Sequence, residues 1–320
     1  MDSIRVFAPA TVANVACGFD VLGFALNEPG DEVVMTKNTS GKVSITKITG
    51  DEGRLSLEAH KNTAGAVVLA LLKDLGITQY GFEIELHKKM PLGSGLGSSA
   101  ASAVASLFAA NELLGKPLTA EQLVAYAMEG ERLACGTAHA DNVAPALMGG
   151  FVLIRSYQPL DLVRIPTPDD LMATVIHPHI EIRTEDARSI LRKNILLKDA
   201  ITQWGNVAGL VAGLIQNDFG LIKRSLQDVI IEPVRSLLIP NFDQIKQAAL
   251  DCGALGCSIS GSGPSIFALS NSPQIAEQVG SAMNAELQKI GIGADVFVSK
   301  INKEGPKVVR ANQVVSQLAQ

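Results

Sequence analysis

Hydrophobic and polar residues alternate over residues 82–87, with apolar side chains at 82, 84 and 86 and polar ones between them. This period of two predicts a half-buried β-strand. Residues 98–114 are rich in alanine and contain no proline or glycine, and Gly115 follows them, a pattern that predicts a helix with a glycine stop. Residues 88–97 between them hold three glycines within five positions. The order is therefore strand, glycine-rich loop, helix.

The same periodicities predict the other elements of the chain. Strands are predicted at residues 4–8 (ended by Pro9), 32–37, 42–48, 151–155, 162–165, 173–176, 265–268 and 295–299. Helices are predicted at residues 62–76, 119–135, 199–215, 221–229, 243–250 and 273–290, with a short one beginning at Thr184. The pattern shifts near Tyr157, which places an N-terminal domain at 1–156 and a C-terminal α+β domain at 157–320.

The glycine-rich loop is suited to binding an anion, because glycines let the backbone approach a ligand and the free N–H groups of a helix start attract negative charge. It is not a Walker A loop, since Ser98 and Ser99, not a lysine, follow Gly97. It also lacks the third glycine of the dinucleotide-binding fingerprint. A phosphate group is the expected ligand. The alternative is a Ser/Gly turn that only caps a core helix.

Composition narrows the class of protein. A chain of 320 residues is long enough for two domains that share a cleft, and 18% charged with 47% hydrophobic residues argues against disorder. The net charge of −5 and the absence of a basic run argue against nucleic acid and anionic membrane surfaces as partners. No signal-peptide pattern opens the sequence, so a cytoplasmic location is expected. The cysteines are expected to be reduced thiols, since they are few and lack C-x2-C spacing: Cys17, Cys135, Cys252 and Cys257.

Two further segments place polar side chains among apolar ones. Asn14 and Asp20 lie in the apolar segment 12–23, and His139, Asp141 and Asn142 lie in the glycine-bounded segment 136–150. Burying such groups is unfavourable unless they find partners, so both segments are candidate walls of a site. Ordinary turns stabilised by these side chains are the alternative.

Three motifs resemble those of the GHMP small-molecule kinases. Residues 91–100 read Pro-x3-Gly-Leu-x-Ser-Ser-Ala, as in the nucleotide-binding motif of that family. Residues 8–23 are similar to the first GHMP motif in its homoserine kinase form, and residues 253–265 to the third motif. The resemblance implies a two-domain α+β GHMP kinase fold, with an N-terminal domain like the second domain of a ribosomal protein and a ferredoxin-like C-terminal domain.

The resemblance also implies the ligands ATP and Mg²⁺. Residues assigned to ATP are Asn62, Lys88, Pro91, Leu92, Gly93, Ser94, Gly95, Leu96, Gly97, Ser98, Ser99, Ala100, Ala101, Gly261 and Gly263. Asn62 would lie near the adenine, although helix capping explains it equally well, and for Lys88 a surface lysine is preferred over one near the phosphates. Ser99 and Glu131 would hold Mg²⁺, which prefers hard oxygen ligands.

Charge complementarity points to an amino-acid substrate. Arg188 and Arg235 are candidates for a carboxylate, because a guanidinium fork matches its two oxygens, and Asp20 assisted by Asn14 is the candidate for an ammonium. Each arginine could instead lie on a solvated helix face. However, residues 184–188 and 232–235 resemble the substrate-binding segments of homoserine kinases. Residues assigned to the substrate are Asn14, Asp20, His139, Asn142, Thr184, Arg188 and Arg235.

The predicted reaction is ATP-dependent phosphorylation of the side-chain hydroxyl of L-homoserine, giving O-phospho-L-homoserine for threonine biosynthesis. Mevalonate lacks an ammonium and would leave Asp20 unpaired at a cost of roughly 2–5 kcal/mol, and galactose lacks both charges. Alternatives are another GHMP kinase, of mevalonate or shikimate type, and a non-catalytic ligand-binding protein of the same fold. A homodimer is an open expectation.

Asn142, Asp141 and Ser99 are the candidate catalytic residues. Related mevalonate kinases are assigned a catalytic aspartate, for which Asp141 is the candidate, whereas homoserine kinases place the neighbouring asparagine by the substrate. We favour positioning by Asn142, and Asp141 is either a base or a structural carboxylate. His139 either contacts the substrate or braces its loop.

Overall fold

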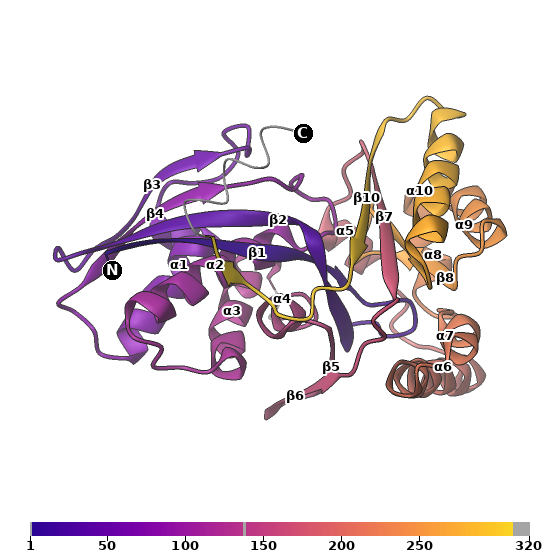
Figure 1. Ribbon diagram of the computed structural model, residues 1–320, viewed down its shortest axis with the longest axis horizontal. Helices are drawn as coiled ribbons and strands as arrows, with labels where there is room; N and C mark the ends of the chain where they lie inside the picture. The colour runs from indigo at the N-terminus through magenta and orange to yellow at the C-terminus, as the bar shows by residue number, and fades with distance from the viewer. Residues whose placement is uncertain (1, 137–138, 310–320) are drawn as a thin grey trace.

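The structure, a computed structural model, describes residues 2–136 and 139–309 (Figure 1). Within these ranges seven strands form the first sheet, in the order β11-β1-β2-β4-β3, with β5 paired to β2 and β6 paired to β5. Their bounds are β1 (Ser3–Ala13), β2 (Leu22–Asn38), β3 (Val43–Thr49), β4 (Gly81–His87), β5 (Phe151–Tyr157), β6 (Leu160–Ile165) and β11 (Lys307–Val308). The predicted alternation places Phe82, Ile84 and Leu86 in the core.

Helices α1 (Thr63–Asp74), α2 (Ser98–Leu113) and α4 (Val143–Met148) pack against this sheet, and α3 (Ala120–Cys135) packs against these three helices. The alanine content of α2 has a direct use, because this helix is buried on nearly all sides by β1, β2 and its neighbouring helices. Small side chains permit such close contacts. A capping box formed by Thr119 and Gln122 is present at the start of α3.

The second sheet has the order β10-β7-β9-β8, from β7 (Met172–Pro178), β8 (Gly256–Ile259), β9 (Ile266–Ser270) and β10 (Ala294–Lys300). Helices α9 (Phe242–Asp251) and α10 (Pro273–Gln288) lie on the side of this sheet away from the first sheet (Figure 1). The remaining helices are α5 (Thr184–Ser189), α6 (Leu197–Gln216), α7 (Phe219–Ser225) and α8 (Glu232–Arg235). None of the helices in the described ranges is long and apolar enough to cross a bilayer.

One hydrophobic cluster contains residues of both sheets, and a second cluster lies between the second sheet and its helices. The ring of Phe24 on β2 lies 4.7 Å from that of Phe151 on β5 and 5.8 Å from that of Phe267 on β9, centroid to centroid. The Ser299 hydroxyl on β10 also accepts hydrogen bonds from the backbone N–H groups of Asn27 and Glu28. The chain therefore holds its two lobes together through packing as well as through the covalent connections.

Several elements differ from the sequence-based expectation. β1 does not end at Pro9 but continues to Ala13 past an irregularity between Pro9 and Thr11, and a bulge tolerates the missing proline N–H. β8, α4 and α8 were not expected, and α7 ends at Ser225 instead of 229. The first sheet extends beyond residue 156, because β6 pairs with β5.

Cys17, Cys252 and Cys257 are free thiols, as expected for a chain without a disulfide scaffold. The side chain of Cys135 lies outside the part of the chain that the structure describes.

Candidate active site

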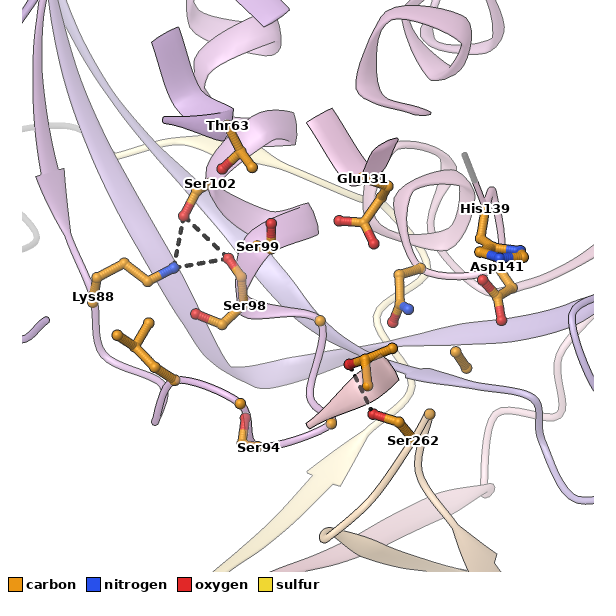
Figure 2. Close-up of a pocket in the computed structure, with 18 of the residues that line it drawn as sticks. Thr63, Lys88, Ser94, Ser98, Ser99, Ser102, Glu131, His139, Asp141 and Ser262 are labelled. Carbon is orange, nitrogen blue, oxygen red and sulfur yellow. Dashed lines mark hydrogen bonds between the residues drawn. The ribbon is translucent and has the colours of Figure 1, made fainter. Parts of the chain in front are cut away.

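A cleft of about 420 Å³ brings together most of the predicted site residues (Figure 2). Predicted residues that line it are Asn14, Asp20, Asn62, Lys88, Leu92, Gly93, Ser94, Gly95, Gly97, Ser98, Ser99, Glu131, His139, Asp141, Asn142, Thr184, Arg188 and Gly261. Six others are not part of the lining: Pro91, Leu96, Ala100, Ala101, Arg235 and Gly263. Of these, Leu96, Ala100 and Ala101 are fully buried.

The glycine-rich loop needs its glycines for conformation and for space. Gly93, Gly95 and Gly97 have φ angles of 68°, 77° and 69°, in the left-handed region that other residues rarely adopt. A Cβ on Gly95 would lie 2.6 Å from the carbonyl oxygen of Ser260. The Ser260 hydroxyl in turn donates to the carbonyl oxygen of Gly95 at 2.7 Å, so the two glycine-rich loops meet here.

Lys88 is not a surface lysine, and that interpretation is wrong. Its ammonium is buried, forms an ion pair with Asp31, and donates to the carbonyl oxygen of Ser98 at 2.8 Å and to the Ser102 hydroxyl at 2.6 Å (Figure 2). Burial lowers the pKa of Lys88, and the negative charge of Asp31 opposes that shift. Asp31 also accepts from the Lys89 N–H at 2.8 Å. Lys88 thus fastens the base of the loop to the start of α2.

Asn62 caps α1, as one of its two interpretations proposed. Its Oδ1 accepts from the N–H of Ala64 at 3.0 Å, and its Nδ2 donates to the carbonyl oxygen of Ser56 at 2.9 Å. The side chain still borders the cleft, which leaves a contact with a bound base compatible with capping.

Ser99 and Glu131 fit a divalent cation by their chemistry. Both line the cleft, Ser99 from the first turn of α2 and Glu131 from the last part of α3 (Figure 2). The Ser99 Oγ is buried and has no hydrogen-bond partner in the described part of the chain. Hydroxyl and carboxylate oxygens are hard ligands of the kind Mg²⁺ prefers, and one or two of them suffice when phosphates supply the rest.

Asp20 and Arg188 form a bidentate ion pair across the cleft. The Nη1 and Nη2 atoms of Arg188 donate to the two carboxylate oxygens of Asp20 at 3.1 and 2.9 Å. His139 Nδ1 lies 3.7 Å from Asp20 Oδ1. Asn14 fixes this loop, because its Oδ1 accepts from the Asp20 N–H at 3.0 Å and its Nδ2 donates to the Gly261 carbonyl oxygen at 2.7 Å.

Arg235 lies behind the cleft wall. Its side chain is buried, with Nε donating to the carbonyl oxygen of Ala187 at 3.1 Å and Nη1 donating to that of Gly261 at 3.0 Å. Burial, followed by the charge of Arg188, lowers the pKa of Arg235 to about 10. The guanidinium groups of Arg235 and Arg188 both lie close to the ring of Phe19, at 5.0 and 5.4 Å from its centroid.

Comparison with known proteins decides the family. The models "GHMP kinases N terminal domain" and "GHMP kinases C terminal" match residues 62–150 and 210–289. A homoserine kinase of Chlorobium phaeobacteroides (strain DSM 266) is 56% identical, over 97% of this chain and 100% of the relative. A homoserine kinase of Chlorobaculum tepidum is 54% identical, over 97% and 99%. The chain belongs to the GHMP kinase family, among the homoserine kinases.

Solved structures of GHMP kinases share the fold. The crystal structure of a homoserine kinase from Cytophaga hutchinsonii superimposes with a TM-score of 0.94 at 62% identity, covering 97% of this chain and 98% of the other. A structure described as a putative homoserine kinase from Listeria monocytogenes gives 0.70 at 25% identity, covering 96% and 99%. The expected α+β GHMP kinase fold is confirmed, and the protein is a kinase that uses ATP.

Two residues of this GHMP kinase site were missed by sequence reasoning. The Tyr157 hydroxyl donates to the Asp20 carbonyl oxygen at 2.7 Å and accepts from the Ala140 N–H at 3.3 Å, so it ties the Asp20 loop to the segment that carries Asp141 and Asn142. The Thr11 hydroxyl donates to Asn142 Oδ1 at 2.7 Å. The sequence offered one weak signal for each, a tyrosine at a strand end and a threonine beside the Asn14 segment.

Proposed function

We propose that the protein transfers the γ-phosphoryl group of ATP to the side-chain hydroxyl of L-homoserine, giving O-phospho-L-homoserine for threonine biosynthesis. The observation that carries this proposal is the Asp20–Arg188 ion pair in a cleft that is also lined by the glycine-rich loop. The relatives at more than 50% identity are named homoserine kinases, which supports the same acceptor.

The ion pair is complementary to an amino-acid zwitterion. Asp20 would take the ammonium of the substrate and Arg188 its carboxylate, so that each member of the pair exchanges its protein partner for a ligand group of the same charge. Because both side chains already face each other at 2.9–3.1 Å, neither charge is left uncompensated before binding. His139 at 3.7 Å from Asp20 would border the ammonium site, and burial lowers the pKa of His139, which favours its neutral form there.

The nucleotide phosphates would lie against the glycine-rich loop and the start of α2. The left-handed conformations of Gly93, Gly95 and Gly97 would let backbone N–H groups approach an anion, and the helix dipole would add to the attraction. Ser99 and Glu131 would hold Mg²⁺, which when bound would neutralise charge on the phosphates. Lys88 acts indirectly, by fixing the loop through Asp31.

Phosphoryl transfer depends mainly on alignment and on neutralising charge, and Asn142 would supply alignment of the acceptor hydroxyl. Asp141 is buried, and its burial together with the charges of Asp20 and Glu131 raises its pKa to about 7. A carboxyl with this pKa can accept a proton near neutral pH, and it can equally serve as a protonated structural group. Both roles stay open for Asp141.

A coupled assay of ADP release with homoserine, mevalonate, galactose and shikimate tests the proposal. Turnover with homoserine alone is the expected result. Turnover with a different acceptor would overturn the specificity, and absence of turnover with all four would favour the non-catalytic alternative. Cytoplasmic location, a homodimer and the lack of a nucleic-acid partner stay predictions, and light scattering after gel filtration tests the homodimer.

A further inference from the structure

Thr11 links strand β1 of the first sheet to the wall of the cleft. It lies on β1, is fully buried, and its backbone N–H donates to the Leu96 carbonyl oxygen at 3.0 Å. Its hydroxyl donates to Asn142 Oδ1 at 2.7 Å, across 131 positions of sequence. A buried side chain thus holds a cleft residue on which the proposed reaction depends.

Asn142 gives up its usual local role to make this contact. It occupies the N-cap position of α4, where an asparagine side chain normally accepts from a backbone N–H of the first helical turn. Here its side chain makes no capping hydrogen bond, and its backbone is helical, with φ −99° and ψ −51°. The Asn142 amide oxygen accepts from the Thr11 hydroxyl and not from a backbone N–H of α4.

The contact also sets the orientation of the amide group. Because Thr11 donates to Oδ1, the Nδ2 donor of Asn142 is directed away from Thr11. The glycine-rich loop also approaches this pair: a Cβ on Gly97 would lie 2.2 Å from Thr11 Oγ1 and 2.8 Å from Asn142 Oδ1. The amide group is thus held where the glycine-rich loop meets the segment that carries Asp141, and Asn142 borders the cleft.

We propose that Thr11 is a positioning residue that holds Asn142 with Nδ2 toward the cleft, so that Asn142 donates a hydrogen bond to an oxygen of the reacting groups, either the acceptor hydroxyl or the γ-phosphoryl. This inference rests on the proposed phosphoryl transfer. A donor fixed in place before the substrate arrives stabilises developing negative charge without reorganisation. Toward the reacting groups, it assigns Asn142 as a hydrogen-bond donor and not as an acceptor or a base.

Substitutions at Thr11 test the positioning role through a split between kcat and KM. Thr11→Val keeps the shape and removes the donor, and we expect kcat to fall at least about tenfold while KM for ATP and for homoserine changes less than about threefold. Thr11→Ser restores the hydroxyl and should keep kcat within about threefold of the wild type. A Thr11→Val enzyme with wild-type kcat would overturn the inference. So would a Thr11→Ser enzyme as slow as Thr11→Val.

Substitutions at Asn142 test the donor. Asn142→Asp can still accept from Thr11 but presents an oxygen to the cleft, so its kcat should fall about a hundredfold, as for Asn142→Ala. Adding Thr11→Val to Asn142→Ala should cause no further loss, because the positioned group is then absent. An active Asn142→Asp enzyme, or losses that multiply in the double variant, would contradict the inference.

The controls separate this inference from the proposed function. Wild-type turnover with homoserine tests the function by itself, and if another acceptor is used, the same variants are compared with that acceptor. Thermal unfolding of each variant shows whether it is folded. Thr11→Val removes the hydroxyl and keeps the branched shape, whereas Thr11→Ser keeps the hydroxyl and removes the methyl group, so the pair separates the loss of the donor from the loss of packing.

Discussion

Asp141 is the carboxyl group whose surroundings change its protonation most clearly. Its pKa rises from 3.8 to about 7 because it is buried and faces the negative charges of Asp20 and Glu131. Between about pH 4 and pH 7 the folded protein therefore binds a proton that the unfolded chain releases, so the free energy of unfolding falls as pH rises through this range. The full loss, reached above pH 7, is of order 4 kcal/mol.

The substitution Asp141→Asn removes this titration. From pH 5 to pH 8, we expect the free energy of unfolding of the wild type to fall by about 2–3 kcal/mol more than that of the variant. Urea denaturation at the two pH values measures this, with Asp170→Asn at an exposed position as the control. Equal pH dependence in Asp141→Asn and wild type would show that the carboxyl is ionised normally.

Arg188 gives a second residue-scale prediction. Arg188→Leu leaves Asp20 without its bidentate partner and removes the proposed carboxylate contact, so KM for homoserine should rise about a hundredfold with KM for ATP nearly unchanged. Arg188→Lys keeps the charge without the guanidinium fork, so its KM for homoserine should lie between those of the wild type and Arg188→Leu. Initial-rate kinetics with each substrate varied measures both constants. Equal increases in the two KM values would mean that the whole cleft is disturbed.

Sequence reasoning succeeded for side chains whose chemistry is local and failed where burial decides. The Asn62 cap, the Asp20 loop and the positive-φ glycines follow from residue type and spacing. Lys88 was misplaced because nothing near it in sequence reveals Asp31, 57 positions away. The backbone contacts of Arg235 with Ala187 and Gly261 are equally non-local, so Arg235→Leu should disturb folding as well as binding.

At the scale of elements, the Lys88–Asp31 pair joins β4, β2 and the start of α2. Lys88→Met would leave Asp31 charged and buried, and we expect a loss of about 3–5 kcal/mol in the free energy of unfolding. Lys89→Met is a matched control, because Lys89 pairs with Glu32 while about half exposed, and it should lose less than about 1 kcal/mol. Guanidinium denaturation measures both. Similar losses in the two variants would contradict a structural role for Lys88.

Elements with a clear period were predicted, and those without one were missed. The strand, loop and helix of residues 82–114 follow from alternation, glycine spacing and an uninterrupted alanine-rich run. β8 was mistaken for a loop because its four residues, Gly256–Ile259, are all buried, which gives no alternation to detect. α4 is only six residues long, with Pro145 inside it, so no helical period could develop.

At the scale of the whole molecule, pairings between distant segments decide the architecture. β11 near the C-terminus returns to pair with β1, and β6 continues the first sheet beyond the expected boundary at residue 156. Strands that pair across a long stretch of sequence leave no local pattern. The domain boundary was therefore predicted at the turn signal near Tyr157. We propose that the boundary follows β6, after Ile165.

The shared core predicts that both lobes unfold together. Phe267 on β9 contacts Phe24 on β2, so Phe267→Ala removes a contact between the sheets and should lower the free energy of unfolding by about 3–5 kcal/mol.

Trp204 is the one tryptophan of the chain and lies on α6 of the second lobe, whereas far-ultraviolet circular dichroism reports on both lobes. In guanidinium, the unfolding transitions followed by tryptophan fluorescence and by circular dichroism should coincide in the wild type. In Phe267→Ala both should shift together. The exposed Leu237→Ala should shift neither by more than about 0.5 kcal/mol. A tryptophan transition that precedes the dichroism transition would mean that the second lobe unfolds alone, and that contacts between the lobes do not make the kinase one cooperative unit.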